Sequence, residues 1–94
     1  MQTLETRQLI AFTELARLGS FTEVANQLGL TQSAVSHSIK ALEKQLEVTL
    51  FERIGKNVTL TLEGQALLPF ANKIITQMQR AQDGIQHLKK PGYG

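Results

Sequence analysis

A single glycine, Gly29, separates two short amphipathic segments, and the turn around it has about four residues. Gly29 can take a positive φ without a steric penalty, and Ala25 is small enough to lie where two helices cross. Leu30, Val35 and Ile39 are apolar and are expected to fill the space between these helices. This spacing predicts a helix-turn-helix, although any tightly packed pair of helices would need similar residues.

Capping signals and apolar spacing predict three helices before residue 50. Thr3 is expected to cap the first helix, which ends at Gly19. The second helix begins at a capping box, Ser20–Glu23, whose two side chains each accept a hydrogen bond from the backbone amide of the other residue. Thr31 is expected to cap the third helix. The residues expected to form the core are Leu9, Phe12, Leu28, Val35, Ile39 and Leu42, and Leu46 continues the spacing of the third helix.

The pattern changes between Leu50 and Leu62, where β-forming residues flank a turn at residues 55–57 and predict a small hairpin. Thr61 is then expected to begin a final helix of about 27 residues. Along it, apolar residues repeat with the spacing of a heptad seam. The seam consists of Leu67, Ala71, Ile74, Met78, Ala81, Ile85 and Leu88. Packing on the first helix would cover its first half, whereas the second half requires a partner, so the sequence predicts a homodimer.

One face of the third helix is polar along its whole length, at about 100° per residue. This face consists of Gln32, Ser33, Ser36, His37, Lys40 and Lys44. Neutral hydrogen-bonding groups come first and cations follow. A surface without a function would more often mix glutamate with lysine. The order therefore favours contact with base edges at the start of the helix and with phosphates behind it, and a plain solvated surface is the alternative.

The composition argues against several other kinds of site. The chain has 94 residues, 41% of them hydrophobic and 19% charged, which is typical of one small globular domain. It has no cysteine, and His37 and His87 are far apart in the sequence, so no metal site is expected. Paired carboxylates, a nucleophile beside a base and a glycine-rich phosphate loop are not evident, so no enzyme is expected. The net charge of +2 is compatible with a nucleic-acid partner but does not require one.

Signals for export and for membrane insertion are also missing from the sequence. No apolar run approaches the roughly 18 residues of a membrane span. The first ten residues do not have the charged and then apolar layout of a signal peptide. The expectation is therefore a cytoplasmic protein with no membrane partner.

Motifs along most of the chain resemble the signature of the LysR-type bacterial transcription regulators. The matching positions lie in residues 25–36 and then at Ile39, Leu42, Glu43, Leu46, Leu50, Phe51, Glu52, Arg53, Leu60, Thr61 and Gly64. The resemblance covers the chain from Leu9 to the end of the last helix. It implies a mainly α fold, which is a winged helix-turn-helix with a three-helix core and a small β-hairpin wing, followed by a long C-terminal dimerisation helix.

The resemblance also implies a division of the chain. Residues 1–60 would be the winged helix-turn-helix domain, residues 61–90 the linker and dimerisation helix, and residues 91–94 a hinge or tail. Chains of the family continue into an effector domain, and these 94 residues are expected to be a DNA-binding domain without it. Because the family's effector binds in that domain, no cofactor is expected in this chain.

The function implied by the resemblance is sequence-specific binding of a partly palindromic double-stranded DNA operator by a homodimer. Helix 32–46 would lie in the major groove and wing 50–60 at the minor groove, where the resemblance places Arg53. A pair of Arg53 with Glu52 or Glu43 is the alternative. The candidate DNA-binding residues are Thr31, Gln32, Ser33, Ser36, His37, Lys40, Arg53 and Lys56. For the intact protein, a tetramer and a contact with RNA polymerase are also compatible with the resemblance.

Three residues depart from the family's pattern. Glu47 stands where many members have the glycine that ends the recognition helix, so this helix is expected to extend a little further. His37 replaces a common arginine, and Asn26 replaces a common alanine at the expected surface. The competing interpretation is a winged-helix protein-interaction module that does not bind DNA. The recognition helix of such a module should be acidic or apolar on its outer face, whereas this one is polar and basic.

Overall fold

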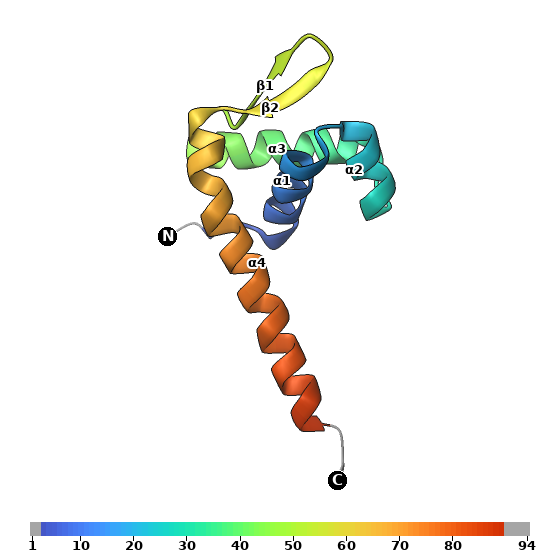
Figure 1. Cartoon of the computed structure of the whole chain (residues 1–94), viewed down its shortest axis with the longest axis vertical. Helices are drawn as coiled ribbons and strands as arrows, with labels where there is room; N and C mark the ends of the chain where they lie inside the picture. The colour runs from blue at the N-terminus through green and yellow to red at the C-terminus, as the bar shows by residue number, and fades with distance from the viewer. Residues whose placement is uncertain (1–2, 90–94) are drawn as a thin grey trace.

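The computed structural model describes residues 3–89, in which three helices, a β-hairpin and a long fourth helix follow one another along the chain (Figure 1). The elements are α1 (Thr6–Leu18), α2 (Phe21–Leu28), α3 (Gln32–Leu46), β1 (Phe51–Ile54), β2 (Asn57–Leu60) and α4 (Leu62–Lys89). The predicted mainly α fold, with a two-stranded wing and a long final helix, is confirmed. The predicted hinge or tail at residues 91–94 lies outside the described residues.

The prediction that Thr3 caps the first helix is wrong, because α1 begins only at Thr6. The residue at the N-cap position is Glu5, and its carbonyl oxygen accepts hydrogen bonds from the Gln8 and Leu9 amides, both at 3.1 Å. Among residues 3–89, no hydrogen bond joins the hydroxyl of Thr3 to a backbone amide of α1. The Thr3 carbonyl oxygen instead accepts a hydrogen bond from Gln45 Nε2 at 2.9 Å, which ties the chain before α1 to α3.

The caps of α2 and α3 follow the sequence more closely. Ser20 Oγ accepts a hydrogen bond from the Glu23 amide at 3.2 Å, and Thr31 Oγ1 accepts one from the Ala34 amide at 3.1 Å. The reciprocal half of the predicted capping box, from the Ser20 amide to the Glu23 carboxylate, does not form in the structure. Gly29 ends α2 with φ +68°, the left-handed conformation that its position requires.

Helix α3 ends at Leu46, and the expectation that it would extend through Glu47 is wrong. Glu47 adopts the left-handed conformation itself, with φ 57° and ψ 40°, at a cost of about 1–2 kcal/mol for a residue with a side chain. The turn offsets part of this cost because the Val48 amide donates to the Glu43 carbonyl oxygen at 3.1 Å. Val48 also packs against the core, so tertiary contact holds a turn that a glycine would otherwise favour.

The core lies where α1, α2 and α3 meet the base of the hairpin. It contains Leu9, Ala11, Phe12, Leu15, Val24, Ala25, Val35, Ile39, Leu42, Leu50, Phe51 and Ala71. The rings of Phe12 and Phe51 lie 5.4 Å apart between centroids and are tilted by 59°, which joins α1 to the wing. Leu28 is half-buried against this core. The prediction that Leu30 fills the space between the helices is wrong, because the turn after Gly29 leaves Leu30 46% exposed.

Backbone contacts fix the position of the wing between α3 and α4. The Leu50 amide donates to Glu43 Oε2 at 2.7 Å, and the Leu50 carbonyl oxygen accepts from the Thr61 amide at 3.0 Å. Thr61 caps α4, since its hydroxyl oxygen accepts from the Gly64 amide at 3.1 Å. A Cβ at Gly64 would overlap the Leu50 carbonyl oxygen, so only glycine lets α4 begin this close to the wing. Strands β1 and β2 are antiparallel, with Phe51 opposite Leu60.

Helix α4 packs on α1 with its first half and then continues away from the rest of the chain (Figure 1). Ala71 is fully buried, and Thr6 Oγ1 donates to Met78 Sδ at 3.6 Å, so α1 covers part of the predicted seam. On another side of α4 an apolar stripe remains uncovered. We call it the free face of α4, and it consists of Phe70, Ile74, Ala81, Ile85 and Leu88. None of the helices within residues 3–89 is long and apolar enough to cross a membrane.

Candidate nucleic-acid interface

An open hollow of about 460 Å³ lies between the outer face of α3, the start of α2 and strand β1. We call it the α3 hollow, and it is lined by Phe21, Gln32, Ser33, Ser36, His37, Lys40 and Arg53. Six of these seven residues were predicted as candidate DNA-binding residues. The seventh, Phe21, was not, because the sequence indicated only that it follows the cap of α2.

Gln32 is the first residue of α3, and its side chain is engaged in the free protein. Its Nε2 donates a hydrogen bond to Thr22 Oγ1 at 2.8 Å, although ten residues separate the two along the chain. Both side chains are exposed. Thr22 was not predicted to have any role, since it lies inside the capping box and does not itself cap a helix. The tertiary pairing of α2 with α3 brings the two residues together.

The remaining side chains of α3 are arranged around Gln32 as their spacing predicted. Ser33, His37 and Lys40 are exposed, and Ser36 is half-buried at the floor of the hollow. Thr31 caps the helix through its hydroxyl oxygen, which leaves the hydroxyl hydrogen available to an acceptor outside the protein. For Thr31, a capping role and a phosphate contact are therefore compatible.

Arg53 points from β1 towards α2, where its guanidinium carbon lies 5.1 Å from the centroid of the Phe21 ring. This geometry is a cation–π contact, which is worth about 0.5–1 kcal/mol at an exposed site. The alternative prediction, a pair with Glu52 or Glu43, is wrong for the described residues. The Glu43 carboxylate accepts from the Leu50 amide instead. Arg53 is thereby held at the edge of the α3 hollow.

Two predicted cations lie outside this hollow. Lys56 is exposed in the turn between β1 and β2, at the tip of the wing. Lys44 belongs to the predicted polar face of α3, but the twist of the helix carries it towards Thr3 and Glu5 near the start of α1. The polar face therefore divides into a first part, which lines the hollow, and a last part, which does not.

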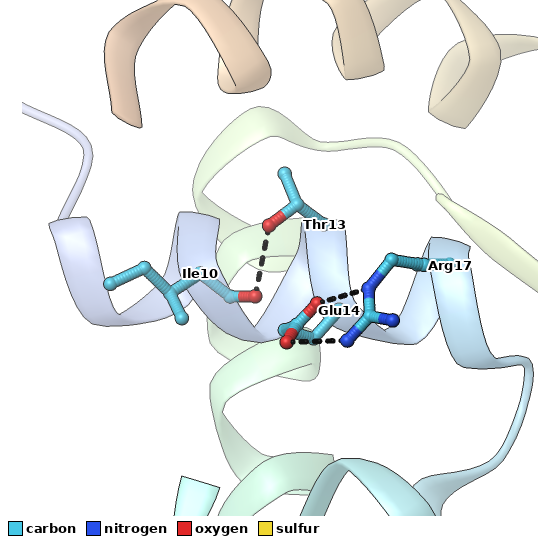
Figure 2. A network of polar contacts seen from close by, with 4 residues as sticks. All are labelled: Ile10, Thr13, Glu14 and Arg17. Atoms are coloured by element: carbon cyan, nitrogen blue, oxygen red, sulfur yellow. Dashed lines mark hydrogen bonds and ion pairs between the residues drawn. The ribbon is translucent and has the colours of Figure 1, made fainter. Parts of the chain in front are cut away.

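The one ion pair within residues 3–89 lies on α1, and Figure 2 shows it. Arg17 Nε donates to Glu14 Oε2 at 2.8 Å, and a second guanidinium nitrogen donates to Oε1 at 3.0 Å. These hydrogen bonds from Arg17 lower the pKa of Glu14 and raise the pKa of Arg17. Over the described range, Lys40, Arg53 and Lys56 pair with no carboxylate. Their charges are therefore available to an external anion.

The α3 hollow thus joins neutral hydrogen-bonding groups at its centre with cations at its border. Among the residues that the structure describes, no carboxylate belongs to its lining. Such a surface suits a polyanion that also presents donors and acceptors to be read, which is the chemistry of a DNA groove. Among residues 3–89, the acidic and histidine side chains form no group of three or more that could hold a metal ion.

Comparison with known families gives a match over most of the folded chain. Residues 6–65 match the family described as bacterial regulatory helix-turn-helix proteins, lysR family. A similar protein is an HTH-type transcriptional regulator of Azotobacter vinelandii from the ibpB-leuC intergenic region. It is 44% identical over 85 residues, which cover 90% of this chain and 59% of that protein. The chain thus spans little more than half the length of this relative.

Two solved structures similar to this chain contain DNA. The complex of the BenM DNA-binding domain with catB site 1 DNA has a TM-score of 0.87 and 27% identity, and the match covers 94% of this chain and 99% of that one. The complex of the CbnR DNA-binding domain with DNA has a TM-score of 0.82 and 31% identity, and the match covers 92% and 99%. The similarity extends over both the helix-turn-helix and α4.

Proposed function

The chain belongs to the lysR family of bacterial helix-turn-helix regulators, and on this premise we propose that it binds double-stranded DNA in a sequence-specific way. The observation that carries the proposal is the α3 hollow, which collects Gln32, Ser33 and Ser36 with unpaired cations on one surface. Relatives with the same fold are solved on DNA. A protein-interaction module would not need this combination of neutral readers and free cations.

In the proposed complex the start of α3 enters the major groove. Gln32 and Ser33 lie at the end of the helix that reaches the bases first, where helix-turn-helix proteins make their base contacts. Lys40 lies two turns further along the helix and is placed to meet a phosphate, as an exposed cation with no partner among residues 3–89. Phosphate contacts position the protein and base contacts give sequence preference.

The wing would contribute Arg53 and Lys56 to the flank of the site. Entry of Arg53 into a narrow minor groove is favoured by the negative potential there. In the free protein the guanidinium rests on Phe21, so entry requires it to give up a contact of about 0.5–1 kcal/mol. We therefore expect the Phe21 contact to hold Arg53 near the DNA in the free protein and to be exchanged on binding.

We also propose that two copies of the chain pair through the free face of α4. Phe70, Ile74, Ile85 and Leu88 are 66%, 40%, 56% and 79% exposed. Burying each of these side chains fully is worth about 1.5–3 kcal/mol, which a single projecting helix cannot recover. Phe70 replaces Ala71 as the partner-facing residue of this turn, since Ala71 is buried against α1. A two-fold dimer would present two α3 helices to a partly palindromic operator.

Further properties follow from family membership and are proposed for the whole regulator. We propose that this chain has no catalytic activity and binds no cofactor, that the regulator acts in the cytoplasm, and that its effector binds outside residues 1–94. Contact with RNA polymerase and assembly to a tetramer belong to the same proposal. The matched residues cover 59% of the Azotobacter vinelandii relative, so the properties of a whole regulator are proposed here from family membership alone.

A salt titration of binding to random duplex DNA tests the proposal against the protein-interaction module. About six phosphate contacts per dimer predict a log–log slope near −5. Lys40→Ala removes one proposed contact per subunit and should flatten this slope by about two units. Gln32→Ala should leave the slope unchanged. It should lower the preference for a specific operator sequence over random DNA. Binding that does not depend on salt, or no binding at all, would contradict DNA binding.

A further inference from the structure

The start of α2 contacts the residue that the proposed function places nearest to the bases. Thr22 is the second residue of α2, and Gln32 is the first residue of α3. The two helices pack on each other through buried residues that include Val24, Ala25 and Val35. The core therefore sets the place of the Thr22 hydroxyl relative to α3. Because threonine is β-branched, its χ1 angle is also restricted.

The hydrogen bond between these residues restricts what Gln32 can offer to a base. A glutamine amide has two N–H donors and one carbonyl acceptor. Thr22 Oγ1 accepts from Nε2 at 2.8 Å, so one N–H is occupied. The groups that remain are one N–H and the Oε1 acceptor.

These two remaining groups match one purine better than the other. In the major groove adenine presents an acceptor, N7, beside a donor, the N6 amino group. Guanine presents two acceptors, N7 and O6, and would need two donors from the protein. An amide that has one N–H already occupied can pair with both adenine groups but can donate to only one of the guanine acceptors.

We propose that Thr22 is a positioning residue that sets Gln32 to read adenine rather than guanine. Thr22 itself contacts no base in this proposal and acts through the orientation of the Gln32 amide. The inference rests on the proposed binding of DNA. It adds a specificity-determining role for a residue of α2, outside the recognition helix.

The test is selection of binding sites from a random duplex library by four forms of the protein. The parent and Gln32→Ala together identify the base pair that Gln32 reads, as the position whose adenine preference is lost in the variant. Thr22→Val removes the hydroxyl and keeps the shape of the side chain. Thr22→Ser keeps the hydroxyl and serves as the matched control.

The expected result is a change at one position only. In Thr22→Val the preference for adenine over guanine at the Gln32 position should fall by about two- to tenfold, the range of one net hydrogen bond. All other positions should keep their preferences, and Thr22→Ser should resemble the parent. An equal loss of affinity for all sequences would overturn the inference, because that is the signature of a phosphate contact by Thr22. Unchanged adenine preference in Thr22→Val would overturn it as well.

Failure of the proposed function gives a different result. If the parent enriches no sequence at all, sequence-specific binding is wrong and the inference falls with it. If the parent enriches a site but the Gln32→Ala selection is identical, only the inference is overturned. Nuclear magnetic resonance of the free protein separates folding from positioning. The side-chain amide protons of Gln32 should shift in Thr22→Val, while the backbone amides of the core keep the parent positions.

Discussion

The α3 hollow and the free face of α4 are both exposed surfaces, and they differ in how favourably water solvates their side chains. The hollow is lined mainly by amide, hydroxyl and charged groups, which water can solvate until DNA replaces it. The free face of α4 exposes Phe70, Ile85 and Leu88, which water solvates at a cost. The α3 hollow can therefore remain exposed to water at little cost in free energy, whereas burial of the free face of α4 against another surface would be favourable.

Support from the rest of the chain differs in the same way. Side chains of the hollow are held by contacts inside the protein, such as Thr22 with Gln32 and Phe21 with Arg53. The second half of α4 has no other element beside it in the described structure (Figure 1). The α3 hollow is therefore arranged in the free protein, whereas within residues 3–89 no other element fixes the shape of the second half of α4.

Breaking the α4 surface should have the largest effect. Ile74→Asp combined with Ile85→Asp places charges on the free face, which opposes burial. We expect monomers that keep the helix-turn-helix fold and bind a full operator little better than a half-site, a loss of about 100-fold or more. Sedimentation equilibrium and operator titration measure the two effects.

The matched control carries the same charges on the opposite side of α4. Gln79→Asp with Gln86→Asp changes two exposed polar residues and should leave the dimer intact. A parent chain that is monomeric at tens of micromolar, or a monomeric control, would contradict the assignment of the dimer to the free face.

The second prediction concerns the joint between the two regions. Gly64→Ala places a Cβ against the Leu50 carbonyl oxygen and 2.7 Å from Leu60 Cδ2, so α4 must move away from the wing. Overpacking of this kind costs about 1–3 kcal/mol. The free energy of unfolding from urea denaturation should fall by that amount.

Gly84→Ala is the control within the same helix. Nothing lies within 4 Å of a Cβ at Gly84, so alanine should raise the helix propensity of α4 and stabilise it by about 0.5–1 kcal/mol. If the two substitutions have the same effect, the close approach of α4 to Leu50 does not limit the position of the wing.

The third prediction tests whether the α3 hollow is arranged in the absence of DNA. A double-mutant cycle of Phe21→Leu and Arg53→Ala should give a coupling of about 0.5–1 kcal/mol in the free energy of unfolding. The same cycle with Lys56→Ala should give a coupling near zero, since Lys56 lies at the tip of the wing. Equal couplings for Arg53 and Lys56 would show that Phe21 does not hold the guanidinium.

The smallest effect is expected away from both surfaces, at the ion pair of α1 (Figure 2). Hydrogen bonds from Arg17 lower the pKa of Glu14 below its ordinary value of 4.5. The pair therefore contributes to stability above that value, and the contribution is lost as the pH falls through the lowered pKa. Glu14→Gln should be slightly less stable than the parent at pH 7 and equal to it in strong acid. Thermal unfolding across this range measures the difference, and a deficit that persists in strong acid would contradict the assignment.

The sequence predicted the order of the elements and most of the helix ends, because these depend on residues close together in the chain. Thr31 caps α3 and Gly29 ends α2 as expected, since each acts within one turn of its own helix. The prediction failed at Glu47 and Leu30, where packing decided the conformation or the burial. A left-handed glutamate is unfavourable by local rules, and the packing of Val48 against the core supports it here.

The candidate site also has features that the sequence predicted and features that only tertiary packing decided. Periodicity was enough to place Gln32, Ser36 and Lys40 on one face, because a helix has a constant turn per residue. The partners of these side chains come from other elements, and the spacing of residues along the chain does not predict which residues these are. Thr22 lies beside Gln32 because the buried residues of α2 and α3 pack together, and Phe21 lies under Arg53 because the Leu50 backbone anchors the wing. Local hydrogen bonding and helical geometry depend on neighbouring residues in the sequence. The distances from Thr22 to Gln32 and from Phe21 to Arg53 depend instead on how the helices and the wing pack on their common core.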